Sequence, residues 1–231
     1  QAGAWGDMSS DMRNEVITTT NFDESKGLQG PRWDEAKSEV VPGQVMVKFF
    51  YKDSDGKELD IKAKDANGEY IFLFEKNGRL FLNSAKVPKE IRQLIGYRIP
   101  YQSIGSEMPL EIVGFLPSNM ELTIVVPDEI LAQMGSDFDY DALNSIISQY
   151  IVRRNEDGSV KGVYRKDREK HADKFTEEEL MLDELRDIFW ATLTTNKKSF
   201  DKMSLGIDDP ALENLAEEIS TILNSNLRTK T

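Results

Sequence analysis

Three aspartates stand at alternate positions in residues 135–143, which read GSDFDYDAL. In an extended or looped backbone alternate side chains point the same way, so these carboxylates would converge. No Lys or Arg lies between residues 121 and 150 to neutralise them. Carboxylates this close repel one another unless they are solvated, protonated or bound to a cation, and Mg²⁺ prefers oxygen ligands. The spacing therefore predicts an Mg²⁺ site, whose ligands would be Asp137, Asp139 and Asp141.

Two other interpretations of the three aspartates were considered. An EF-hand loop starts with the same alternation, but it needs Gly at its sixth position and a bidentate Glu at its twelfth. Those positions hold Ala142 and Ser148, which excludes that loop. A solvated acidic turn with no ligand fits the spacing equally well, because short Asp-rich loops are common.

Composition excludes several other kinds of site. The chain has 231 residues, of which 39% are hydrophobic and 30% charged, as in an ordinary globular protein with a real core. There is no cysteine, so disulfides and thiolate zinc sites are excluded. The single histidine, His171, lies in the charged stretch REKHADKF and is typical of a solvated surface residue.

The formal net charge is -12, whereas a free-standing nucleic-acid binder normally has a basic surface. If this chain contacts nucleic acid, we expect another polypeptide segment to supply the cations, or a bound metal to invert the local charge. No apolar run approaches the 18 or so residues of a membrane span, so no membrane partner is expected.

The chain divides into three predicted segments. Residues 1–43 are predicted to form an extended N-terminal arm, because Gly, Ser, Pro and charged residues are mixed there with little hydrophobic periodicity. Their first ten residues lack the features of a signal peptide and do not begin with Met, which is typical of a fragment or a processed product. Residues 44–168 are predicted to form a β-rich barrel domain, and residues 169–231 a helical C-terminal segment.

Within the β-rich segment, residues 45–83 predict an antiparallel meander with turns at Asp55-Gly56 and Asn77-Gly78. A short helix is predicted over 87–96, and buried strands over 110–116 and 122–127. One or two helical turns are expected over 128–134, then a strand over 145–154 that continues as a hairpin. No internal repeat was recognised.

The C-terminal segment changes to helical periodicity. Thr176 and Glu179 form a capping box that opens a helix over 176–193. A second amphipathic stretch is predicted over 210–228.

Several motifs in order resemble one known family. Cellular two-barrel RNA polymerases carry Asn-Ala-Asp-Phe-Asp-Gly-Asp on a double-psi β-barrel, downstream of an Arg-x-Pro segment. This chain has YRIPYQ at 97–102, then two buried-strand runs, then GSDFDYD at 135–141. Residues 96–152 are more closely similar to the single-chain DNA-dependent RNA polymerases of crAss-like bacteriophages. Tyr140 stands where the cellular enzymes have Gly, and Gly135 where they have Asn.

The resemblance implies an α+β fold with a mostly β core. It would be a double-psi β-barrel-like domain, preceded by the β-meander and followed by the C-terminal helices. The three aspartates would be catalytic and hold a permanent Mg²⁺ for nucleotidyl transfer, while Arg98 and Gln102 would lie on the substrate side.

The same resemblance implies partners. The complete enzyme would need a second barrel from other segments or subunits, together with DNA template, RNA and nucleoside triphosphates. The chain would be a fragment or subunit that is inactive alone, found in the virion and in the host bacterial cytoplasm. Two alternatives remain: a non-catalytic virion structural or cargo protein that retains the barrel, and an acidic β-rich binding module.

Overall fold

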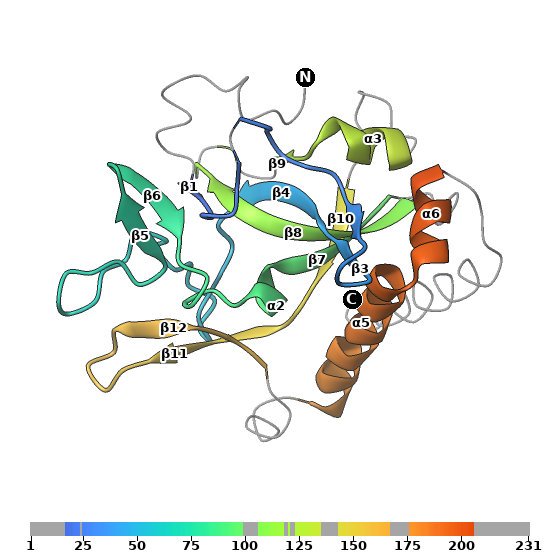
Figure 1. Ribbon diagram of the computed structural model, residues 1–231. Coiled ribbons are helices and arrows are strands. Elements are labelled where there is room, and N and C mark those ends of the chain that lie inside the picture. Colours follow the sequence, from blue (N-terminus) through green and yellow to red (C-terminus); the bar gives the residue numbers. More distant parts are fainter. Residues whose placement is uncertain are drawn as a thin grey trace.

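The computed structural model describes residues 17–23, 25–98, 106–117, 120, 123–134, 143–166 and 176–205 (Figure 1). Within these residues the fold is mixed α+β, with a strand-rich core and helices after it. The strands are β1 (Ile17–Thr18), β2 (Arg32–Asp34), β3 (Glu39–Val41), β4 (Gly43–Lys48), β5 (Leu73–Lys76), β6 (Arg79–Leu82), β7 (Gln93–Arg98), β8 (Glu107–Leu116), β9 (Ile124–Val125), β10 (Leu143–Ile147), β11 (Tyr150–Arg154) and β12 (Val160–Arg165). The helices are α2 (Lys89–Arg92), α3 (Asp128–Met134), α5 (Glu177–Thr195) and α6 (Lys197–Leu205). The predicted α+β class is confirmed.

Strand β8 is the centre of the main sheet. It pairs with β7 and β1 in antiparallel orientation and with β4 in parallel orientation (Figure 1). Nine of its ten residues are buried. A strand buried on both faces is typically a near-continuous apolar run, and the buried strand predicted over 110–116 is confirmed within β8.

The sheet continues outward from β8 in both directions. Strand β7 is followed by β10, β4 is followed by β9, and β1 is followed by β6 and β5. Side chains from β4, β7, β8, β9 and β10 all line one groove of about 460 Å³. Strand β10 ends the branch through β7 and β9 ends the branch through β4, and residues of both strands line this groove.

The predicted meander is only partly formed. Strands β5 and β6 make the expected hairpin around Asn77 and Gly78, both of which have positive φ. Strand β4 is different, because it pairs with β8 and β9 and not with its neighbours in sequence. Its residues Val45 and Met46 are fully buried, and only the middle of the sheet offers apolar contacts on both faces.

The helix predicted over 87–96 is wrong in its second half. Helix α2 ends at Arg92, and β7 starts at Gln93 between β8 and β10. Gly96, which was interpreted as a helix end, lies in the ladder. A Cβ at Gly96 would stand 2.6 Å from Leu110 Cδ1, so its lack of a side chain allows close packing of β7 on β8.

The strand predicted over 145–154 is two strands, because Ser148 and Gln149 separate β10 from β11. The hairpin around Asp157-Gly158 joins β11 to β12. Its loop recurs twice elsewhere, although no repeat was recognised in the sequence. In residues 53–57, 65–69 and 155–159, the first amide donates to the last carbonyl and a glycine amide donates back to the first carbonyl.

Helix α5 begins with the predicted capping box, since Thr176 Oγ1 accepts from Glu179 N and the Glu179 side chain accepts from Thr176 N. Its residues Phe189 and Leu193 pack on Ile95 of β7. The described part of the predicted arm supplies β1 to the main sheet and the β2–β3 hairpin, whose Trp33 ring lies 6.2 Å from that of Phe200 in α6. The amphipathic stretch predicted over 210–228 lies outside the described residues. No described helix is long and apolar enough to cross a membrane.

We predict that Gly114→Ala destabilises the fold strongly. A Cβ there would stand 2.5 Å from the backbone oxygen of Ile17, so β1 would have to move away from β8. Chemical denaturation should show a loss of about 1–3 kcal/mol in the free energy of unfolding. Gly162→Ala in β12 is the control, since its closest neighbour is the Tyr164 side chain at 3.3 Å. Equal losses in both variants would contradict the close approach of β1 to β8.

Candidate functional site

Four of the five predicted site residues lie outside the described part of the chain. These are Asp137, Asp139, Asp141 and Gln102. Among the described residues, no group of three His, Cys, Asp or Glu side chains could hold a metal ion. The donor set that the sequence offers for Mg²⁺ is therefore still the three aspartates, whose carboxylate oxygens suit that ion chemically.

Arg98 is the described member of the predicted site. It is the last residue of β7, and it pairs with Leu143, the first residue of β10. Its Nη1 donates a hydrogen bond to the backbone oxygen of Met134, the last residue of α3, at 3.3 Å. The last carbonyls of a helix have no partner inside it and carry partial negative charge, so a guanidinium is stabilising there.

Two contacts of Arg98 are with the residues that flank the aspartate motif. Met134 and Leu143 are the described residues immediately before and after residues 135–142. Met134 accepts a hydrogen bond from Arg98, although it is 36 positions away in sequence, and Leu143 is the strand partner of Arg98. The described residues on either side of the motif thus both contact Arg98.

The elements that hold these ends are firmly packed. Helix α3 follows Pro127, whose carbonyl accepts from Ile130 N at 3.1 Å, and Ile130 is buried in the main core. Strand β10 is held by five consecutive pairs with β7. Arg186 of α5 supports β7 from the other side, since its Nη2 donates to Gln93 O at 2.8 Å.

The apolar groove opens next to the exit of the motif. Leu143, Ser145 and Ile147 of β10 line one side, and Val47 and Ile124 line the other. Lys48 and Glu58, at its rim, form an ion pair at 3.9 Å. The groove brings mainly apolar surface to the neighbourhood of Leu143, and Glu58, paired with Lys48, is the one acid among its described lining residues.

Glu107 is an unexpected buried acid in the same part of the sheet. It starts β8, pairs with Tyr97 of β7 and is 6% exposed. Its Oε2 has no hydrogen-bond partner among the described residues. Burial raises the pKa of Glu107 to about 8, so the carboxyl group is largely protonated at neutral pH. Sequence alone could not predict this, because the burial of Glu107 follows from the pairing of β8 with β7.

We predict that Glu107 makes stability fall as pH rises. The pKa of the Glu107 carboxyl is about 8 in the folded protein, against an ordinary value of 4.5. The stability contribution of this group is therefore complete and independent of pH below pH 4.5, and it falls between pH 4.5 and pH 8, where the unfolded chain releases the proton first. Urea denaturation should show the wild type losing up to about 1.4 kcal/mol per pH unit relative to Glu107→Gln. Parallel pH profiles of the two proteins would contradict a buried, protonated Glu107.

Comparison with known proteins adds no relative. No family model matches the chain, and no curated protein is significantly similar to it. The resemblance to phage RNA polymerases accordingly remains a prediction from the motifs.

Proposed function

We propose that this chain is the metal-binding catalytic-centre segment of a bacteriophage DNA-dependent RNA polymerase. Asp137, Asp139 and Asp141 would hold Mg²⁺, which, when bound, acidifies the RNA 3′-hydroxyl and stabilises charge on the transferring phosphate. The observation that carries the proposal is the position of Arg98, in contact with both residues that flank the motif. This supports the proposal, because a catalytic centre of this kind needs the arginine motif and the aspartate motif to lie close together.

The fold we propose is a double-psi β-barrel. Supporting it are the groove that β10, β7, β8, β4 and β9 line together and the parallel pairing of β4 with β8. Barrel closure removes sheet edges and holds loops at a fixed mouth, where ligand sites commonly form. The aspartate segment joins α3 to the first residue of β10, at one end of a strand that lines the groove.

In this proposal Arg98 has a positioning role. Its hydrogen bond to Met134 O and its pairing with Leu143 hold the two ends of the aspartate segment at one place. A guanidinium there also offsets the negative charge that three carboxylates accumulate. Gln102, four residues later in the chain, is proposed to lie on the substrate side.

The complete enzyme is proposed to require more than this chain. A second barrel would supply the cations that face the triphosphate, and DNA template, RNA and nucleotides would bind between the two barrels. Virion and host cytoplasm are the proposed locations. We expect the isolated chain to incorporate no nucleotides; robust incorporation that Asp139→Asn abolishes would contradict this.

The metal site can be tested directly. Calorimetric titration with Mg²⁺ should show one saturable site in the wild type that is lost in Asp139→Asn. Asp55→Asn, which changes an exposed loop aspartate, should leave it unchanged. In NMR spectra, Mn²⁺ should broaden the amide signals of Arg98 and Leu143 and spare that of Gly158 in the β11–β12 loop.

Failure of this titration would favour the alternative function. If neither metal saturates a site near Leu143, the chain is better explained as a virion structural or cargo protein that keeps the barrel. If Asp55→Asn weakens binding as much as Asp139→Asn, the ion is held by general surface charge.

We further predict that Arg98→Gln weakens Mg²⁺ binding about tenfold, because residues that orient metal ligands typically contribute this much to affinity. Arg32→Gln, at an exposed arginine that bonds only to Gln29 among the described residues, is the control. Calorimetry of both variants, with thermal melts to establish folding, checks this. An unchanged Mg²⁺ affinity in folded Arg98→Gln would contradict the positioning role.

A further inference from the structure

One end of the molecule is basic although the whole chain is acidic. Residues 48–89 and 150–164 carry twelve Lys and Arg against nine Asp and Glu, a local charge of +3 in a chain of net charge -12. Arg165 and Lys166, which follow, pair with acids of α5 and are not counted. Their strands β5, β6, β11 and β12 lie at the end of the molecule away from α5 and α6 (Figure 1). The overall charge therefore conceals a cationic surface.

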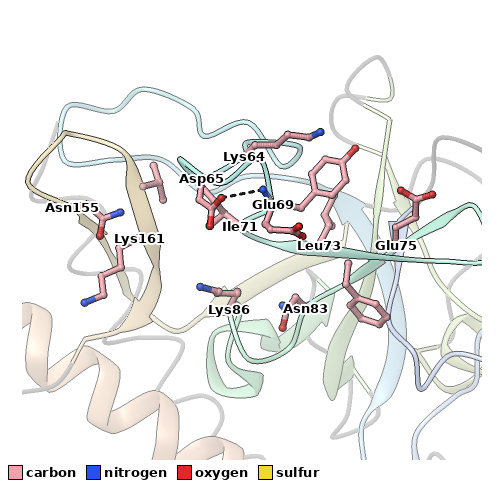
Figure 2. A pocket seen from close by; sticks show the side chains of 14 residues that line it. Lys64, Asp65, Glu69, Ile71, Leu73, Glu75, Asn83, Lys86, Asn155 and Lys161 are labelled. Carbon is pink, nitrogen blue, oxygen red and sulfur yellow. Dashed lines mark hydrogen bonds between the residues drawn. The ribbon is translucent and has the colours of Figure 1, made fainter.

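A pocket of about 740 Å³ opens in this surface. Three separate segments each place a lysine on its lining: Lys64 in the 65–69 loop region, Lys86 in the turn after β6, and Lys161 in β12 (Figure 2). Lys86 and Lys161 are exposed, and neither forms an ion pair within the described part of the chain. The lining also holds three acids, Asp65, Glu69 and Glu75, so its formal charge is zero. Amines on three sides that form no ion pair with a described residue can still contact more than one anionic group of a ligand.

Aromatic rings accompany these cations. Tyr70 and Phe74 line the same pocket, and both are half-buried, so part of each ring faces out. The Lys64 Nζ lies 4.8 Å from the centre of the Tyr70 ring. The Phe74 ring stacks on Phe81 at 5.7 Å between centres. Flat apolar faces next to lysines are the combination on which nucleic-acid bases stack while their phosphates pair with cations.

The pocket also contains hydrogen-bonding groups that a simple polyanion site would not need. The Asp65 carboxylate is occupied within its own loop, where it accepts from Asn67 N and Glu69 N (the latter shown dashed in Figure 2). Glu69 and Glu75 are exposed on the lining and form no ion pair with a described residue. Carboxylates would repel phosphate, but they accept hydrogen bonds from the amino groups of bases. The mixture favours nucleotides over a uniformly anionic polymer.

We propose that this pocket binds nucleotides of a single-stranded nucleic acid. Phosphates would lie against Lys64, Lys86 and Lys161, and a base would stack on the exposed face of Tyr70 or Phe74. A strand is favoured over a free nucleotide because the two hairpins carry further cations outside the pocket lining, namely Lys76, Arg79 and Arg153. The proposal is independent of the proposed function, since none of these residues belongs to the aspartate motif or contacts Arg98.

The test uses the full chain and a fluorescein-labelled 12-nucleotide strand, as DNA and as RNA, in fluorescence anisotropy at several salt concentrations. The wild type should bind saturably at low salt. Lys64→Gln/Lys86→Gln/Lys161→Gln should weaken binding at least tenfold and make the slope of log K against log salt shallower by about 2, since about 0.7 counterions are released per phosphate contact on a single strand. Tyr70→Leu should weaken binding with little change in that slope.

The matched control is Lys26→Gln/Lys37→Gln/Lys198→Gln, which removes the same charge from lysines outside the pocket. It should bind the strand as the wild type does, and so should Asp139→Asn, even if the metal site is lost or was never present. Equal weakening by the two triple variants, absence of saturable binding to both strands, or equally tight binding of free ATP at this pocket would each overturn the proposal.

Discussion

The pairing of three different strands along the two edges of β8 is the constraint on which the other elements depend. On one edge β7 pairs with residues 107–111 and β1 with residues 114 and 115, while β4 pairs with residues 110–116 on the other edge. This arrangement buries charge as well as apolar surface: the Arg92 guanidinium bonds to Glu111 Oε1 at 2.9 Å and to Ile112 O at 3.1 Å. Breaking such a pair leaves an uncompensated buried charge, which fixes α2 against β8.

The candidate site follows from that constraint. Strand β7 is held between β8 and β10, and its outer face is covered by Phe189 and Leu193 of α5. Arg98 is the last described residue of this supported strand, so its guanidinium is carried by a rigid element. Functional groups on strands and helices are positioned more accurately than groups on loops alone. The ends of α3 and β10 are thereby brought to the same point.

Features determined by neighbouring residues could be predicted from sequence. The capping box of α5 and the turn at Asn77-Gly78 each need only a few adjacent residues, and both are confirmed. Features determined by distant pairing could not. The residues after Arg92 form a strand because β8 and β10 lie on either side of them, and β4 leaves the meander because β8 and β9 can bury it.

The same distinction applies to the site. Alternating aspartates were visible in the sequence, but the meeting of Arg98 with Met134 and Leu143 depends on the β7–β10 ladder. The lysine pocket could not be predicted from sequence, because Lys64, Lys86 and Lys161 are each ordinary surface residues in their own segments. Whole-chain net charge concealed them too, since it averages over opposite ends of the molecule.

That uneven distribution of charge over the described residues contributes a permanent electric dipole, whose positive end carries β5, β6 and the β11–β12 loop. In dilute salt, such a dipole turns a molecule before contact, so an approaching polyanion and an approaching cationic protein would meet different ends. At physiological ionic strength this torque acts only within about 8 Å of the surface. The dipole would then orient the molecule relative to a charged partner only within that distance, and this needs no conformational change.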